Sequence, residues 1–295
     1  PTPQNTLSLH DALPISFIEA GMGGLHDSTN LFSPLAVICP SIGLDHQAVL
    51  GNTHAEIATE KAGVLKNGAS FIYATDRTDV RDVFKQKANE EGSKTYELGK
   101  DFTAEGSSHS FDFIYKEQRL EGIALAMAGQ HQVANASLAI MASLLLQKDY
   151  PKVTPELIKD ALAHASWLGR TEFLMPNLMI DGAHNNESVK VLIDLLRSEY
   201  ADKDIELLFA AIDTKPIDSM LAQLESVGDL TVTSFEYPNS VKLDKYPVTY
   251  KQVSDFQTWI EEHVTANDDK LYVITGSLYF ISQVRKWILE QERAV

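Results

Sequence analysis

The sequence predicts an α/β protein whose second half is a mostly parallel sheet with helices on both faces. From Leu178 onward, short runs rich in β-branched and aromatic residues alternate with segments whose apolar residues recur at helical spacing. Strands and helices that alternate in this way form parallel sheets, because each connecting helix packs back onto the sheet. The pattern breaks at residues 167–170, so we place a domain boundary near Gly169.

The length of the chain agrees with two domains. A chain of 295 residues, of which 44% are hydrophobic, can bury a sizeable core, and usual domain sizes favour two domains over one. We predict one domain over residues 17–168 and a smaller one over residues 169–295. Residues 1–16 show no periodicity and read like a translated linker, so we interpret them as a non-native leader.

Composition argues against several locations and partners. No apolar run is long enough to span a bilayer and no secretory signal pattern is present, so we expect a cytoplasmic protein without membrane contacts. The single cysteine, Cys39, lies in an apolar run and is interpreted as a small buried hydrophobic residue. The net charge of −16 opposes nucleic-acid binding, which depends largely on Lys and Arg neutralising phosphates.

In the first domain, the short apolar run PLAVICPSIG is flanked by Pro and Gly, which predicts a buried strand at 35–39. Thr53 and Glu56 have the spacing of a capping box, which predicts a helix at 54–65. The same periodicities predict strands at 70–74, 95–98, 111–115 and 121–127, the last three in a hairpin region, and helices at 78–90, 131–147 and 154–164.

In the second domain, the alternation predicts four strands, each followed by a helix. The strands are expected at 178–183, 206–212, 230–235 and 271–276, and the helices at 186–199, 215–226, 254–264 and 277–291.

Lys61 lies on the apolar side of the helix predicted at 54–65. Its neighbours three and four residues away are Ile57, Ala58, Val64 and Leu65. Desolvation penalises a buried ammonium unless something compensates. Such a lysine either extends its head to water at the helix edge or is modified or paired within a site, and the residues alone leave both interpretations open.

Acidic and imidazole groups precede this helix. Glu19 lies in FIEAGMGG, and Asp45 and His46 follow the strand at 35–39 in IGLDH. Ligands bind at the carboxyl ends of parallel strands in open α/β sheets, and a carboxylate with an imidazole can hold a divalent cation. A lone histidine would be interpreted more simply as a surface residue, so a metal site requires these groups to come together.

The strand at 178–183 leads into the sequence DGAHNNE, which places Asp181 and His184 before a helix N-terminus. Backbone N–H groups there favour anions, and an Asp at a strand end commonly accepts hydrogen bonds from ribose hydroxyls. Asp181 and Asn185 could equally cap the helix, and the sequence does not decide between these roles. Arg170 could bind phosphate oxygens bidentately or be a surface arginine.

Six segments carry a specific combination of residues: EAGMGGLHDSTN, IGLDHQAVLGNTHAEIATEKAGVLK, AGQHQVANASLAIMA, LGRTEF, MIDGAHNN and TGSLYF. In content and order they resemble the folylpolyglutamate synthases and related dihydrofolate synthases of the Mur-ligase-like superfamily. The resemblance covers nearly everything from Phe17 to the C-terminus. It implies that residues 17–168 are the remainder of an incomplete P-loop-type ATPase domain and that residues 169–295 form a Rossmann-like glutamate-ligase domain.

The resemblance also implies roles for the residues described above. Carbamylation of Lys61 is implied, and it would turn a costly buried cation into an anion that can face a metal. The implied Mg²⁺ ligands are Glu19, His46 and Lys61; the implied ATP contacts are His131, Asn135, Arg170, Asp181 and His184; the implied catalytic residues are Lys61, Arg170 and His184; and Ser277 and Tyr279 are implied to lie near the glutamate pocket.

The reaction implied by the resemblance is the ATP-dependent addition of L-glutamate to the γ-carboxylate of a folate. The carboxylate is activated as an acyl phosphate, and the amine of the incoming glutamate then displaces phosphate. Domain closure would exclude water from the reactive acyl group. The implied partners are folate, L-glutamate and ATP, and we expect the chain to act as a monomer.

One feature of the family does not occur in the sequence. No Gly-x-x-x-x-Gly-Lys-Ser/Thr loop is found, and GVLKNGAS is no substitute because Lys66 precedes its second glycine. We therefore expect a truncated copy with weak or no ligase activity. The alternatives are a non-catalytic protein that binds nucleotide or glutamate, and a bifunctional dihydrofolate synthase. The lack of a strand-linked Gly-x-Gly-x-x-Gly argues against an oxidoreductase, and TGSLYF argues against a cell-wall ligase.

Overall fold

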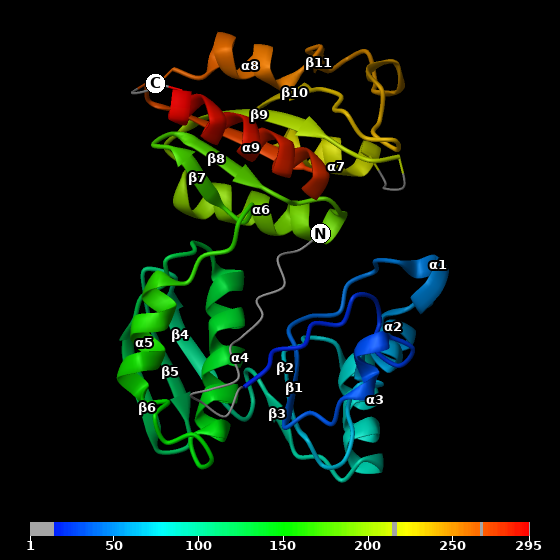
Figure 1. Ribbon diagram of the computed structural model, residues 1–295, viewed down its shortest axis with the longest axis vertical. Helices are drawn as coiled ribbons and strands as arrows, with labels where there is room; N and C mark the ends of the chain where they lie inside the picture. Colours follow the sequence, from blue (N-terminus) through cyan, green and yellow to red (C-terminus); the bar gives the residue numbers. More distant parts are fainter. Residues whose placement is uncertain (1–14, 214–216, 266–267, 295) are drawn as a thin grey trace. The chain divides into compact units, whose positions relative to one another are not determined.

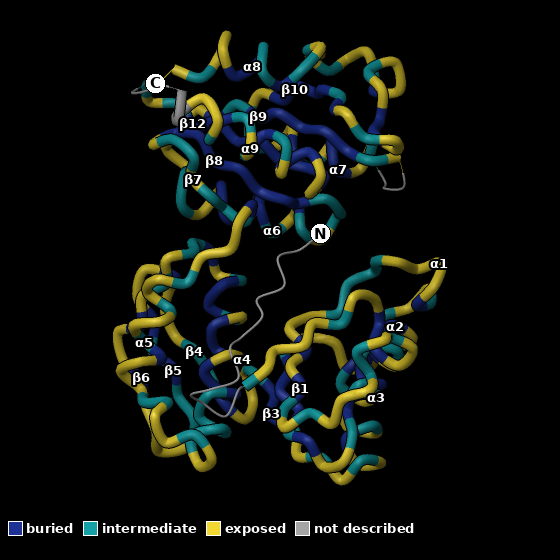
Figure 2. Tube along the Cα trace, in the orientation of Figure 1, coloured by how far each residue is buried: buried dark blue, intermediate teal, exposed yellow. Residues whose placement is uncertain are grey.

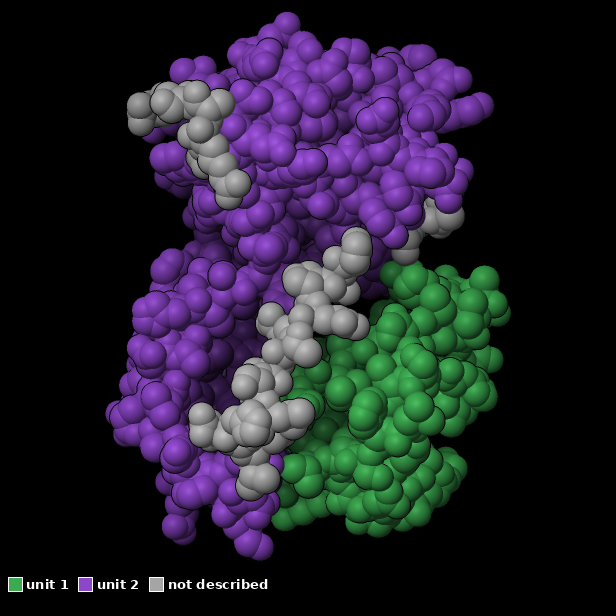
Figure 3. All heavy atoms as spheres, viewed as in Figure 1, with its two compact units in different colours: residues 1–96 green, residues 97–295 purple. Residues whose placement is uncertain are grey.

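A computed structural model describes residues 15–213, 217–265 and 268–294. The chain divides into two compact units, Pro1–Tyr96 and Glu97–Val295 (Figure 3). The boundary predicted near Gly169 lies within the second unit and stays a prediction. Of the predicted leader, residues 1–14 lie outside the described residues.

The first unit is built on a three-stranded sheet in the order β1 (Ala36–Cys39), β2 (Ser70–Tyr73) and β3 (Thr95–Glu97) (Figure 1). β1 pairs with β2 in parallel. Alternate residues of these strands pack against α2 (His54–Ala62) and α3 (Thr78–Glu90). This core centres on Phe84, whose ring lies 4.9 Å from that of Phe71 and 5.0 Å from that of Tyr73.

Most elements predicted in this unit are confirmed. The strands expected at 35–39 and 70–74 and the helix expected at 78–90 are present, and the helix expected at 54–65 is present as α2, which ends earlier, at Ala62. The strand expected at 95–98 was wrongly placed in a hairpin region, since β3 pairs in this sheet. The short helices η1 (Ser28–Leu31) and α1 (Gln47–Leu50) were not predicted.

The second unit begins with an antiparallel sheet of β4 (Thr103–Ser107), β5 (Ser110–Tyr115) and β6 (Gln118–Ile123). β4 was missed because TAEGS has no apolar pattern and is largely exposed. β6 begins earlier than the strand predicted at 121–127. Its first residues were not predicted, because they are mostly polar and show no strand pattern. The predicted helices at 131–147 and 154–164 are confirmed as α4 (Gln130–Leu146) and α5 (Pro155–His164).

The rest of the second unit is a six-stranded, mostly parallel sheet in the order β11-β10-β9-β12-β8-β7, which confirms the predicted α/β class. Only β7, at one edge, is antiparallel to its neighbour. The strands are β7 (Glu172–Met175), β8 (Leu178–Asp181), β9 (Asp204–Ala210), β10 (Asp229–Val232), β11 (Lys251–Gln252) and β12 (Lys270–Gly276). The helices are α6 (Asn186–Glu199), α7 (Ile217–Leu224), α8 (Phe256–His263) and α9 (Leu278–Ala294), and η2 (Leu243–Lys245) is a short additional turn.

The central strands of this sheet are buried on both faces (Figure 2). Met179 faces α6 and α7, whereas its neighbours Leu178 and Ile180 face α8 and α9. β9 and β12 alternate in the same way, so the two faces carry separate cores. The helices on both faces were predicted from the sequence, but the strands β7 and β11 were not. Residues 215–216 of the helix predicted at 215–226 lie outside the described residues.

No helix in the described part of the chain combines the length and the apolar character that crossing a membrane requires.

Candidate functional site

The main cluster of predicted site residues lies at the carboxyl edge of the six-stranded sheet. β8 ends there at Asp181. Because β7 runs antiparallel to β8, with Glu172 opposite Ile180, the chain enters β7 at this same edge. The turn before β7 is therefore brought against the loop after β8, and the N–H of Gly182 donates to the carbonyl of Gly169 at 2.8 Å.

The carbonyl of Gly182 joins two of the predicted residues. It accepts a hydrogen bond from Nη1 of Arg170 at 3.1 Å and lies 2.7 Å from Nδ1 of His184. Because a carbonyl only accepts, Nδ1 of a neutral His184 must carry the proton, and Nε2 is then an acceptor. A Cβ added at Gly182 would meet Cδ2 of Leu278, so the partly exposed Leu278 side chain would have to shift.

Asp181 is nearly buried, with 7% of its surface exposed. Its Oδ2 accepts the backbone N–H of Thr171 at 2.8 Å, and the N–H of Ala183 also donates to this carboxylate. Burial raises the pKa of Asp181, although the Thr171 hydrogen bond and the positive charge of Arg170 oppose the shift. Asp181 thus holds the backbone of the turn that carries Arg170.

Helix capping, the alternative considered for this segment, is performed by Asn185 and not by Asp181. Oδ1 of Asn185 accepts the N–H of Ser188 at 2.9 Å, and the Ser188 hydroxyl lies 3.1 Å from the N–H of Asn185. This reciprocal pair begins α6. Asp181 is therefore available for a different role at the strand end.

His131 lies in the first turn of α4, and its imidazole interacts electrostatically with Arg170. Burial lowers the pKa of its imidazole, and the nearby charge of Arg170 lowers this pKa further. Asn135 is exposed one turn later, where its Nδ2 donates to Oε1 of Gln132 at 3.2 Å. The structure thus brings His131 near enough to Arg170 for the charge of the guanidinium to act on the imidazole.

Ser277 and Tyr279 lie where β12, the strand adjacent to β8, passes into α9. Ser277 is buried, and its hydroxyl accepts the N–H of Tyr279 at 3.3 Å. Tyr279 is half exposed and stacks on Tyr237 with ring centroids 4.1 Å apart. Thr275 is the register partner of Asp181, and its buried Oγ1 has no hydrogen-bond partner among the described residues.

The three predicted metal ligands lie in the first unit. Glu19 and His46 are exposed, and the N–H of His46 donates to Oδ1 of Asp45 at 2.8 Å. Lys61 is half-buried on α2, close enough to Cys39 for its charge to affect the thiol. No group of three or more His, Cys, Asp or Glu side chains in the described parts of the chain is arranged to hold a metal ion.

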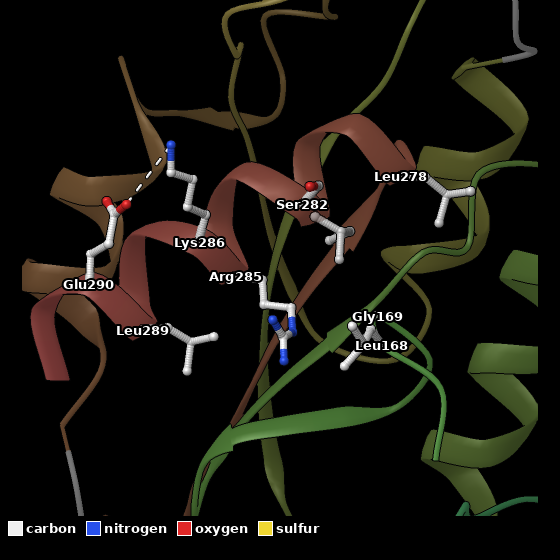
Figure 4. Close-up of a pocket in the computed structure, with 9 residues that line it drawn as sticks. Leu168, Gly169, Leu278, Ser282, Arg285, Lys286, Leu289 and Glu290 are labelled. Carbon is white, nitrogen blue, oxygen red and sulfur yellow. Dashed lines mark ion pairs between the residues drawn. The ribbon is translucent and has the colours of Figure 1, made fainter. Parts of the chain in front are cut away.

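The sequence did not single out Glu172 and Arg285, which adjoin the cluster. Nε of Arg285 donates to both carboxylate oxygens of Glu172, at 2.9 and 3.1 Å. Arg285 also lines a pocket of about 420 Å³ between α9 and the turn at Gly169 (Figure 4). The only available indication was the place of Glu172 in LGRTEF, next to Arg170 and Thr171.

Comparisons with known proteins show what the chain as a whole is similar to. A dihydrofolate synthase/folylpolyglutamate synthase of Bacillus subtilis is 33% identical over 286 residues, which cover 91% of this chain and 66% of the relative. The apo form of L. casei FPGS superposes with a TM-score of 0.77 at 27% identity, covering 92% of this chain and 65% of that one. An FPGS–AMPPCP–folate complex gives a TM-score of 0.78 at 26% identity, with the same coverage of both chains.

The chain thus spans slightly less than two thirds of the length of the B. subtilis relative, at 66%. No protein-family model matches the chain.

Proposed function

Because the chain belongs to the family of folylpolyglutamate and dihydrofolate synthases, we propose that it adds L-glutamate to the γ-carboxylate of a folate in an ATP-dependent reaction. The observation that carries this proposal is that Arg170 and His184 meet at the carbonyl of Gly182, while Asp181 accepts the N–H of Thr171, next to Arg170. The FPGS complex with AMPPCP and folate supports the same classes of ligand. Folate, L-glutamate and ATP are the proposed partners, and the cytoplasm is the proposed location.

Arg170 is proposed to bind the phosphates of ATP. Its guanidinium has five N–H donors, and Nη1 to Gly182 is the one side-chain hydrogen bond that it makes to the described residues. The other donors can bind phosphate oxygens and stabilise negative charge there. Bound ATP would supply the phosphoryl group that makes the folate carboxylate reactive toward the amine of L-glutamate.

His184, Asp181 and His131 are proposed to position the nucleotide. With its proton on Nδ1, His184 can accept a hydrogen bond from a ligand at Nε2. Asp181 fixes the backbone N–H of Thr171 and so orients Arg170. His131 has a lowered pKa and thus stays neutral beside Arg170, which avoids repulsion between two cations. Asn135, Ser277 and Tyr279 remain proposed contacts for nucleotide and glutamate.

Binding of AMPPCP, measured by calorimetry, tests the role of Arg170. Arg170→Met removes the guanidinium and keeps an unbranched apolar stem, so we expect at least about tenfold weaker binding. Arg197→Met is the matched control, because Arg197 lies on α6 and bonds the hydroxyl of Ser226. Equal affinity of the wild-type chain and Arg170→Met would contradict the proposed nucleotide site.

Transfer of labelled L-glutamate to folate tests the ligase itself. The 295 residues contain no Gly-x-x-x-x-Gly-Lys-Ser/Thr loop, so we expect slow ATP-dependent transfer that Arg170→Met abolishes. Fast turnover would show that the chain does not need such a loop. Nucleotide binding without detectable transfer would favour the alternative, a non-catalytic binding protein.

The name of the B. subtilis relative joins two activities, so the second substrate is also proposed and tested. Dihydropteroate offered as the acceptor in place of folate would separate a bifunctional dihydrofolate synthase from a folate-specific enzyme. Transfer to both acceptors is the expected result for the bifunctional alternative.

Glu19, His46 and a carbamylated Lys61 remain the proposed Mg²⁺ ligands, because a carbamate would replace the ammonium of Lys61 by oxygen atoms that can face a metal. No step of the reaction is assigned to the metal. Native mass spectrometry of the intact chain should show the added mass of one carbon dioxide, absent from Lys61→Arg. An unmodified Lys61 under bicarbonate would contradict this part of the proposal.

A further inference from the structure

The turn that carries Arg170 has an unfavourable backbone conformation. Gly169 has a φ of +71°, which glycine adopts readily, but Thr171 has a φ of +43°. A β-branched residue at positive φ is strained, because its side chain crowds the backbone. The Thr171 hydroxyl does not compensate, since Oγ1 is buried and has no hydrogen-bond partner among the described residues. Other groups must therefore hold this turn in place.

Two carboxylates hold the turn by its backbone. Oδ2 of Asp181 accepts the N–H of Thr171 at 2.8 Å, and Oε2 of Glu172 accepts the N–H of Gly169 at 2.7 Å. Hydrogen bonds from N–H groups to ionised carboxylates are stronger than those between neutral groups. Arg170 lies between the two residues that are held in this way.

Glu172 is itself fixed by Arg285 of α9. Nε of Arg285 donates to both oxygens of Glu172, and the two side chains are 29% and 19% exposed. An ion pair this far removed from water is screened less than a surface pair. In Figure 4 Arg285 extends from α9 toward the strands, on the side where Gly169 and Leu168 lie. The pair thus ties α9 to the turn.

We propose that Glu172 and Arg285 are positioning residues, which keep the strained turn at 169–171 in the conformation that presents Arg170 to the ligand. This inference rests on the proposed function of Arg170. Without the pair, the N–H of Gly169 loses its acceptor and the turn relaxes toward negative φ at Thr171. The guanidinium of Arg170 then leaves the carbonyl of Gly182 and the place where phosphate oxygens bind.

The first test measures the turn directly and needs no ligand. In Glu172→Ala and Arg285→Met, hydrogen–deuterium exchange of peptides that cover residues 167–172 should be about tenfold faster than in the wild-type chain. Unchanged exchange in these peptides would overturn the proposal, whatever the nucleotide affinity. Failure of the proposed function does not affect this readout, so the two failures can be told apart.

The second test measures coupling to Arg170 through AMPPCP binding. Glu172→Ala should weaken binding about tenfold in the wild-type background and less than about twofold in the Arg170→Met background. If Glu172→Ala weakened AMPPCP binding by the same factor in both backgrounds, the positioning role would be overturned. Glu172→Gln, which keeps an acceptor for Gly169 but loses the charge facing Arg285, should lie between the wild-type chain and Glu172→Ala.

Asp112 offers a closely matched control within the antiparallel sheet. Its Oδ1 accepts the N–H of Gly122, which also has a positive φ of 61°, and its Oδ2 pairs with Arg119 at 2.6 Å. Asp112→Ala removes the same kind of carboxylate bridge at a place without a proposed ligand. It should leave AMPPCP binding unchanged. A loss of affinity as large as that of Glu172→Ala would show a general effect on folding and would overturn the proposal.

Discussion

At the scale of single residues, Asp181 shows how one side chain can serve a site at the expense of the fold. Its carboxylate organises the Thr171 backbone, yet it lies in an environment that disfavours its own charge. Burial is the largest cause of its raised pKa. The ionised form is thus less stable in the folded chain than in the unfolded one, where water solvates it.

Asp181→Asn should therefore stabilise the fold at neutral pH. A raised pKa in the folded state contributes stability that is present below the ordinary value of 3.8 and is lost as pH rises through the folded pKa. The wild-type chain should lose stability relative to the variant as pH rises over this range. Urea unfolding at a series of pH values measures the difference.

Asp255→Asn is the control with the opposite sign. Asp255 caps α8 by accepting the N–H of Thr258 at 2.8 Å, and this hydrogen bond lowers the pKa of its carboxyl. The stability that its charge contributes is present above pH 3.8 and is lost as pH falls. If the stability difference from the wild-type chain changed with pH in the same direction for both variants, the raised pKa of Asp181 would be contradicted.

The residues of the site were only partly predictable. Asp181 and His184 follow a predicted strand end, and Arg170 lies where the pattern breaks near Gly169, so the sequence indicated all three. Glu172 was missed because β7, which it begins, was not predicted, and a charged residue outside a predicted element is usually solvated. Its partner Arg285 is 113 residues away, and only the paired sheet and α9 bring them together.

At the scale of elements, α2 owes its first turn to the capping box that the sequence predicted. The hydroxyl of Thr53 accepts the N–H of Glu56 at 3.2 Å, and Oε2 of Glu56 accepts the N–H of Thr53 at 2.9 Å. The N–H of Asn52, the hydroxyl of Thr53 and the N–H of Thr53 all donate to the carboxylate of Glu56 and lower its pKa. The cap thus fixes the start of the helix that carries Lys61.

Thr53→Ala should reduce the free energy of unfolding by about 1 kcal/mol, because an N-terminal N–H of α2 loses its acceptor. Thr59→Ala is the control on the same helix, since the Thr59 hydroxyl only bonds back to the carbonyl of Ala55. It should be neutral or slightly stabilising. Equal losses in the two variants, measured by urea unfolding, would show that the cap is unimportant.

Elements with a strong apolar period were predicted well, and those formed by pairing alone were not. The helices at 78–90 and 186–199 have the predicted bounds, because each has one continuous apolar side. β4 and the two-residue strand β11 carry no such pattern and exist because a neighbouring strand supplies hydrogen-bond partners. The prediction for 95–98 found the strand but not its sheet, since pairing partners depend on the tertiary fold.

At the scale of the whole molecule, the two units carry separate natural probes. The single cysteine, Cys39, is in the first unit, and burial raises the pKa of its thiol to about 11. The three tryptophans, Trp167, Trp259 and Trp287, are all in the second unit. Each unit can therefore be followed during unfolding without introducing a label.

Two separate unfolding transitions are the expected result. Cys39 should resist alkylation at neutral pH until the first unit opens, because the folded thiol is both buried and protonated. Pulsed alkylation along a urea gradient should thus give a midpoint that differs from the midpoint of tryptophan fluorescence. Coincident midpoints would show that the two units unfold as one cooperative body.

Because β7 lies at the edge of the six-stranded sheet, we expect it to detach before the inner strands unfold when the protein is heated. It pairs with one strand of the sheet, β8, and the pairing is interrupted between Phe173 and Met175. An outer strand with one interrupted ladder detaches more readily than the inner strands melt. Mild heating should thus abolish ligand binding while circular dichroism still shows an intact sheet. A melting temperature measured by spectroscopy alone would then overestimate the temperature up to which the chain binds its ligand.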